Sequence, residues 1–214
     1  MYKAVIFDFD YTLGDTTDGT VQSVNYALEE LGYSSRDVSE IKRTIGMSLR
    51  ETFAVLSDCR DADTANEFVR LYSKKADEVM TDSAELYDCV PELLRELHKT
   101  RMIGIVSTKF HHRIELILKK FSSDSLVDVI VGAEDVNVEK PHPEGLLSAI
   151  SRLEIEPSEA LFVGDTLVDA LTAQNAGVDF AAVRTGITTD FSLYNNVFIG
   201  ENLTDIYKFV VYGK

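Results

Sequence analysis

Short, mainly apolar runs alternate with amphipathic segments along most of the chain. Runs of four or five residues are too short for helices, so they predict buried strands at residues 4–7, 102–106, 127–131, 160–163 and 180–183, with a short further strand at 197–199. Between these runs, apolar residues recur at steps of three and four, which predicts helices. Strands that alternate with helices indicate an α/β fold with a doubly wound parallel sheet.

The pattern changes just after the first strand. Residues 15–90 show helical periodicity and no convincing strand, and Ser48 with Glu51 matches a capping box at a helix start. We therefore predict two domains. Residues 1–14 and 91–214 form the parallel-sheet core, and residues 15–90 form an all-helical domain inserted into it.

Composition and charge narrow the possible partners. The chain has 214 residues, 45% of them hydrophobic and 27% charged, which is ordinary for a globular protein with a sizeable core. The formal net charge of -15 argues against nucleic acid as a partner, because phosphate backbones are bound by an excess of Lys and Arg. A small phosphorylated metabolite needs only a few local cations and stays compatible with this charge.

The sequence also argues against a membrane or secretory role. No apolar run approaches the roughly 20 residues that span a bilayer, and the N-terminal run ends in two acids rather than a cleavage site. Cys59 and Cys89 lack metal-ligand spacing, and we interpret them as buried free thiols. We expect a cytoplasmic protein. No pattern specifies its oligomeric state.

Two carboxylates follow the first predicted strand. Asp8 and Asp10 are two positions apart, and side chains alternate along a strand, so both lean toward the same side while the strand lasts. Two like charges held close together are costly unless a cation or a proton lies between them. A solvated strand end is the simpler interpretation of this pair alone. Metal binding or acid–base chemistry is the alternative.

Further polar residues follow the other predicted strands. Ser107 and Thr108 come after residues 102–106, Asp165 follows residues 160–163, and Lys140 lies in a strand-to-helix loop. Ligands of open parallel sheets bind outside the carboxyl ends of the strands, so these groups are expected to converge there. Carboxylates suit Mg²⁺, and hydroxyls with a lysine suit phosphoryl oxygens. Taken singly, each residue has a simpler explanation as a turn, a surface lysine or a helix cap.

The joint pattern resembles the haloacid dehalogenase superfamily, and specifically its members with a helical cap inserted after the first strand, such as phosphoglycolate phosphatases. Four motifs carry the resemblance, namely Asp8-Phe9-Asp10-Tyr11-Thr12, Ile103-Gly104-Ile105-Val106-Ser107, Lys140-Pro141-His142-Pro143-Glu144 and Gly164-Asp165-Thr166-Leu167-Val168-Asp169. Two residues depart from the family pattern. Tyr11 replaces the usual glycine, which bears on the entrance or on cap closure, and Thr108 replaces a common asparagine.

The resemblance implies a Rossmann-like core and a role for each motif residue. Asp8 is expected to be the nucleophile that becomes an aspartyl phosphate, and Asp10 the general acid and base. The phosphoryl-binding residues are expected to be Ser107, Thr108 and Lys140. The expected Mg²⁺ site comprises Asp8, Asp10 through its backbone carbonyl, Asp165, and Asp169, which orients the other groups. The implied activity is hydrolysis of a small phosphorylated metabolite.

Other activities stay possible at this point. Inorganic pyrophosphatase, sugar-phosphate phosphatase and β-phosphoglucomutase-like mutase are alternatives within the same superfamily. Mutases place an arginine directly after Gly-x-Ser in the cap, whereas Gly46-Met47-Ser48 is followed by Leu49 and only then by Arg50, which favours hydrolysis. A receiver-type signalling module also uses an Asp, a Ser or Thr, and a Lys at strand ends, but it has no large helical insertion.

Overall fold

The computed structural model describes residues 2–188 and 190–213 and divides the chain into two compact units. One unit comprises Met1–Gly14 with Leu86–Lys214, and the other comprises Asp15–Glu85. The first unit holds a six-stranded sheet in the order β5-β4-β1-β6-β7-β8, in which every pair of neighbouring strands is parallel. Its strands are β1 (Ala4–Phe7), β4 (Met102–Val106), β5 (Val129–Val131), β6 (Ala160–Gly164), β7 (Asp179–Val183) and β8 (Phe198–Gly200).

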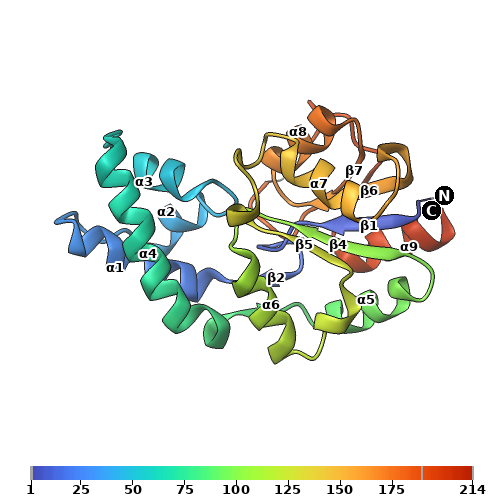
Figure 1. Cartoon of the computed structure of the whole chain (residues 1–214), viewed down its shortest axis with the longest axis horizontal. Helices are drawn as coiled ribbons and strands as arrows, with labels where there is room; N and C mark the ends of the chain where they lie inside the picture. The colour runs from blue at the N-terminus through green and yellow to red at the C-terminus, as the bar shows by residue number, and fades with distance from the viewer. Residues whose placement is uncertain (1, 189, 214) are drawn as a thin grey trace. The chain divides into compact units, whose positions relative to one another are not determined.

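Helices cover both faces of this sheet, as in a doubly wound α/β fold. On one face α7 (Glu144–Arg152) and α8 (Leu167–Ala176) pack against each other, and on the other face α5 (Val90–His98) packs against α9 (Leu203–Tyr212) (Figure 1). Helix α6 (His111–Lys120) contacts β5. The described residues of this unit also form three 3₁₀ turns, η1 (Asp124–Leu126), η2 (Ala133–Asp135) and η3 (Pro157–Glu159). The predicted fold class is confirmed.

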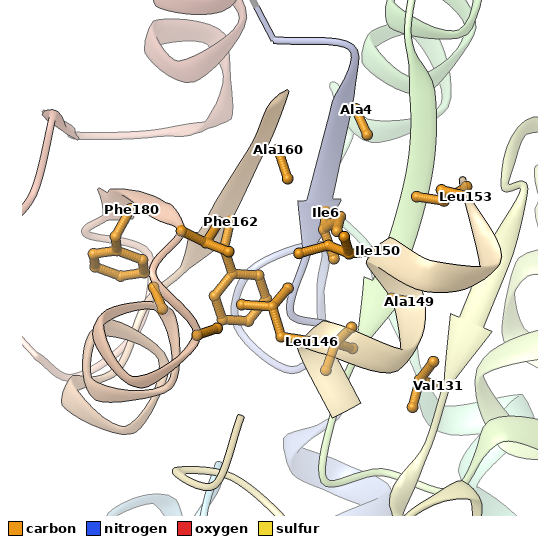
Figure 2. Close-up of a cluster of buried hydrophobic side chains, with 14 of the residues drawn as sticks. Ala4, Ile6, Val131, Leu146, Ala149, Ile150, Leu153, Ala160, Phe162 and Phe180 are labelled. Atoms are coloured by element: carbon orange, nitrogen blue, oxygen red, sulfur yellow. The ribbon is translucent and has the colours of Figure 1, made fainter. Parts of the chain in front are cut away.

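A hydrophobic core lies between the sheet and helices α7 and α8. Ile6 on β1 and Phe162 on β6 are register neighbours, and Leu146 and Ile150 from α7 point toward them (Figure 2). All four side chains are buried. Val5 and Phe7, which point to the other face of β1, are buried as well, so this strand is covered on both faces as its apolar run predicts.

The predicted strands of the six-stranded sheet differ from the observed ones only at their ends, whereas the two short strands at residues 14–15 and 85–86 were not predicted. The strand expected from residue 127 begins at Val129, because Val127 follows the 3₁₀ turn η1 and caps it. Strand β1 ends at Phe7, one residue before the first carboxylate. Pro91 occupies the first turn of α5, where a missing backbone N–H costs nothing. Gly177 ends α8 in the left-handed conformation.

The second unit is built from four α-helices, α1 (Thr17–Glu30), α2 (Val38–Lys42), α3 (Leu49–Ser57) and α4 (Ala62–Ser83). The two long helices, α1 and α4, pack closely, since a side chain at Gly19 would meet Met80 and Ser83 of α4. The capping box of Ser48 with Glu51 begins α3 as predicted. Two short strands, β2 (Gly14–Asp15) and β3 (Glu85–Leu86), pair where the chain enters and leaves this unit.

Among the described residues, no helix combines the length and the apolar character needed to cross a bilayer.

Candidate active site

The site begins where β1 ends. Asp8 directly follows Phe7, and its backbone N–H donates to the carbonyl of Val163 on the neighbouring strand β6 at 2.8 Å. The chain then turns, because Tyr11 adopts the left-handed conformation with a φ of 58° and its N–H donates to the Gly14 carbonyl. Glycine adopts this conformation without strain, which gives a physical reason for a glycine at this position and makes Tyr11 a strained exception.

Lys140 joins two carboxylates of the site. Its Nζ lies 2.8 Å from Asp8 Oδ1 and 2.6 Å from Asp169 Oδ1, and all three side chains are buried. Burial alone would lower the pKa of Lys140, but the charges of Asp169 and Asp8 outweigh it and raise the pKa above its ordinary value. Lys140 therefore stays protonated and supplies a permanent positive charge to the site.

Lys140 does not neutralise all of the buried acids, as the pKa values of Asp8 and Asp165 indicate. Burial raises the pKa of Asp8 to about 6, opposed by Lys140 and reinforced by the charges of Asp169 and Asp10. Burial also raises the pKa of Asp165 well above its ordinary value, and the charges of Asp169 and Asp8 add to that effect. Carboxylates that share a site with too few cations favour protonation or the binding of a metal ion.

Asp165 follows β6, the strand next to β1, and has an unsatisfied oxygen. Its Oδ1 accepts a hydrogen bond from Thr12 Oγ1 at 2.9 Å. Its Oδ2 is buried and has no hydrogen-bond partner among the described residues. A buried polar atom without a partner is costly, so an additional group is expected there.

The donor set fits a hard divalent cation. Asp8, Asp165 and Asp169 each offer a carboxylate oxygen, and these oxygens lie within 4.8 Å of one another. All three residues are buried, and Oδ2 of Asp165 needs a partner that the described residues do not supply. Carboxylate oxygens are the ligands that Mg²⁺ prefers, so the residues present suit Mg²⁺.

Asp169 differs from the other two acids, because both of its oxygens already have partners. It lies in the first turn of α8, where Oδ2 accepts from Thr166 N at 3.1 Å and from Thr166 Oγ1 at 2.5 Å. Its Oδ1 is the atom that Lys140 contacts. The capping box thus fixes the Asp169 carboxylate beside the cluster, an arrangement that suits an orienting group.

Asp10 lies outside the three-acid cluster and pairs with a second lysine. Lys109 Nζ lies 3.2 Å from Asp10 Oδ1, and both side chains are buried. The backbone of Lys109 is held by its own N–H, which donates to Ser107 Oγ, and by Ala133 N, which donates to its carbonyl. We had not predicted a role for Lys109. Its position directly after the Ser-Thr pair at a strand end is the signal that could have indicated one.

Ser107 and Thr108 lie at the end of β4, the strand on the other side of β1. Ser107 is buried and its N–H donates to the Val131 carbonyl at 3.1 Å, whereas Thr108 is half-buried. The structure therefore brings Asp8, Ser107 and Asp165 to the ends of three adjacent strands. Thr12, the last residue of the first motif, reaches the same site through its hydrogen bond to Asp165.

Comparisons with known proteins agree with this geometry. Residues 5–183 match the family model of the haloacid dehalogenase-like hydrolases. The chain is 33% identical over 181 residues to pyrophosphatase PpaX of Bacillus thuringiensis (strain Al Hakam), covering 85% of this chain and 82% of that protein.

Solved structures give the same result. A crystal structure from Bacteroides fragilis, named as a haloacid dehalogenase-like hydrolase, is 42% identical with a TM-score of 0.93, covering 96% of this chain and 100% of that one. A crystal structure from Lactobacillus plantarum, named as a phosphoglycolate phosphatase, is 25% identical with a TM-score of 0.84, covering 97% of this chain and 99% of that one.

Proposed function

The chain belongs to the haloacid dehalogenase-like hydrolase family and is a phosphatase, and from this premise we propose that it hydrolyses a small phosphorylated metabolite with Mg²⁺ through an aspartyl phosphate on Asp8. The observation that carries the proposal is the buried, unpartnered Oδ2 of Asp165, which has no hydrogen-bond partner among the described residues and belongs to a cluster of three acids. Three carboxylates held this close repel one another when ionised, and a bound cation would remove that cost.

Asp8 and Asp165 would hold the Mg²⁺ ion, with the backbone carbonyl of Asp10 as the family resemblance implies, and Asp169 would orient the site. When bound, Mg²⁺ would neutralise part of the negative charge of the phosphoryl oxygens. Lys140 would supply the remaining positive charge beside Asp8. Ser107 and Thr108 would bind phosphoryl oxygens from the adjacent strand end.

The reaction would proceed in two steps. In the first, an Asp8 carboxylate oxygen forms a bond to phosphorus, the bond between phosphorus and the leaving oxygen breaks, and Asp10 gives its proton to that oxygen. In the second, Asp10 takes a proton from water, the water oxygen attacks phosphorus, and the Asp8–phosphorus bond breaks to release phosphate. Lys109, at 3.2 Å from Asp10, would hold the carboxylate in place for both transfers.

Two substrate classes are supported by the relatives. The Lactobacillus plantarum neighbour favours a phosphoglycolate phosphatase-like activity on a phosphate monoester. The PpaX relative favours inorganic pyrophosphate as the second candidate. A sugar-phosphate phosphatase or a β-phosphoglucomutase-like mutase is the remaining alternative. The helical insertion, which we predict as a cap domain of residues 15–90, would contribute to substrate specificity.

We place the enzyme in the cytoplasm, because Cys59 and Cys89 are both free thiols and free thiols are typical of reducing compartments.

The proposal is tested by a substrate panel. Purified protein is assayed for phosphate release from phosphoglycolate, pyrophosphate, several sugar phosphates and an aryl phosphate, with Mg²⁺ and with excess chelator. We expect hydrolysis that needs Mg²⁺ and that is abolished in Asp8→Asn, since the amide removes the nucleophilic charge and a metal ligand. Full activity in chelator, or in Asp8→Asn, would contradict the proposal. Isomerised sugar phosphate without phosphate release would identify a mutase instead.

A further inference from the structure

The segment directly after β7 approaches the Asp165 carboxylate very closely. A Cβ atom built on Gly186 would lie 1.9 Å from Asp165 Oδ2, 2.8 Å from its Cγ and 3.2 Å from its Cβ. Real Cβ atoms essentially never come within 3.0 Å of another heavy atom outside their immediate chain neighbours. The space that a side chain at position 186 would need is therefore occupied by the carboxylate.

Conformation is not what requires a glycine here. Gly186 is not among the residues with positive φ, so a left-handed backbone is not the reason for a glycine at this position. What alanine could not do is share the space with Asp165. The methyl group that Gly186→Ala introduces would have to displace the carboxylate by about 1 Å, and the atom displaced is the same Oδ2 that has no partner among the described residues.

The preceding residue, Thr185, is linked indirectly to the other oxygen of the same carboxylate. The Thr185 hydroxyl donates a hydrogen bond to the backbone carbonyl of Tyr11, the residue in the left-handed turn. Thr12 follows directly, and its hydroxyl donates to Asp165 Oδ1 at 2.9 Å. A fixed Tyr11 carbonyl restricts the turn that carries Thr12, and Thr12 in turn fixes the carboxylate.

We propose that Thr185 and Gly186 are positioning residues that aim the Asp165 carboxylate at a divalent cation. Gly186 leaves free the space beside its backbone that Oδ2 occupies, and Thr185 restrains Oδ1 through the Tyr11–Thr12 turn. The inference rests on the proposed function in one respect, that Asp165 binds the metal ion.

Direct metal binding separates this role from loop packing. Mn²⁺, which can replace Mg²⁺ at oxygen sites and is visible by electron paramagnetic resonance, is titrated into the full-length protein without substrate. The variants are Gly186→Ala, Thr185→Val and Thr185→Ser. The matched control is Gly177→Ala in the same unit, because Gly177 has a φ of +69° and an added Cβ would meet nothing within 4 Å.

We expect Gly186→Ala to weaken Mn²⁺ binding about 10- to 100-fold, the range typical for residues that orient metal ligands. Gly177→Ala is expected to lower the melting temperature through backbone strain while leaving the Mn²⁺ dissociation constant unchanged. Thr185→Val should weaken binding severalfold, and Thr185→Ser should restore it because the hydroxyl is kept.

Wild-type Mn²⁺ affinity in a folded Gly186→Ala variant would overturn the inference while leaving the proposed function intact. Wild-type affinity in Thr185→Val would overturn the part assigned to Thr185. If Gly186→Ala does not fold, the contrast between Thr185→Val and Thr185→Ser decides, and equal affinities in those two overturn the inference. Absence of Mn²⁺ binding to the wild-type protein would contradict both the inference and the proposed function.

Discussion

Lys140 Nζ lies 2.8 Å from Asp8 Oδ1, although 132 positions separate the two residues. The fold accounts for this proximity, because β1 lies in the middle of the sheet and Lys140 comes from the loop between β5 and α7. The same Nζ also contacts Asp169, so one buried cation serves two buried acids. Lys140 is thus the main internal counter-charge of the cluster.

Replacing Lys140 with methionine should therefore affect both activity and stability. The variant keeps most of the side-chain volume but leaves Asp8 and Asp169 without their cation, and breaking a buried ion pair typically costs about 3–5 kcal/mol. We expect a lower melting temperature in chelator and near-complete loss of phosphate release. Lys3→Met is the control, since Lys3 pairs with Glu159 at the surface. Equal effects of the two substitutions would contradict the assignment.

Asp165 and Asp169 should respond differently to the same substitution. Asp165→Asn removes a charge that raises the repulsion in the cluster, so the metal-free protein should melt at the same temperature or higher while thermal stabilisation by Mg²⁺ disappears. Asp169→Asn removes a partner of Lys140, so the metal-free protein should melt lower. Its Mg²⁺ affinity should fall about 10- to 100-fold. Calorimetry of both variants, in chelator and in Mg²⁺, gives the four melting temperatures that this comparison needs. The reverse ranking would exchange the two roles.

The raised pKa of Asp8 predicts how stability depends on pH. In the folded protein Asp8 titrates at about 6, above its ordinary value of 3.8, so folding favours its protonated form. Its contribution to metal-free stability is fully present below pH 3.8 and is lost as the pH rises through about 6. A bound Mg²⁺ would favour the ionised form of Asp8, so we expect stabilisation by Mg²⁺ to grow over the same pH interval.

Thermal unfolding in chelator and in Mg²⁺, at one pH about a unit below 6 and at another about two units above it, measures this difference. Asp8→Asn should reduce the pH dependence of stability between these two pH values, and Asp165, whose pKa is also raised by burial, contributes to what is left. A Mg²⁺ effect that is equal at both pH values in the wild-type protein would contradict the prediction.

Phe162 links the hydrophobic core to the site. Its ring is fully buried among the side chains in Figure 2, and Lys140 Nζ lies 5.7 Å from the ring centroid. Phe162→Ala should cost about 3–5 kcal/mol in free energy of unfolding through the cavity it creates. Leu116→Ala is the control, because Leu116 is exposed and surface truncations usually change stability by less than about 0.5 kcal/mol. A loss for Phe162→Ala no larger than that of the control, measured by denaturant unfolding, would contradict the packing described.

The sequence predicted the sheet well because its signals are local. The strand expected at residues 102–106 coincides with β4, and Ser48 with Glu51 begins α3 as predicted. The family resemblance is confirmed by the match over residues 5–183. The error at the start of β5 came from a 3₁₀ turn, since one short turn leaves no periodic pattern.

The contacts that surround the motifs could not be predicted in the same way. The bond between Thr12 and Asp165 joins residues 153 positions apart, and Thr185 contacts Tyr11 across 174 positions. Neither contact follows from periodicity or capping rules, because each depends on how two loops meet at the sheet edge. The position of Lys109 after the Ser-Thr pair indicates a role at the strand end, but its contact with Asp10 depends on the fold.

The most direct test of the central claim is detection of phosphate bound covalently to Asp8. In Asp10→Asn the first step should still occur with an aryl phosphate, whose leaving group departs without a proton, whereas the second step lacks its base. Rapid quenching followed by mass spectrometry should then show one added phosphoryl group, located by peptide mapping on Asp8 and absent from the double variant Asp8→Asn with Asp10→Asn. If Asp10→Asn forms no covalent species, and phosphate release slows equally for aryl and alkyl esters, the account of Asp8 as nucleophile and Asp10 as acid and base is contradicted.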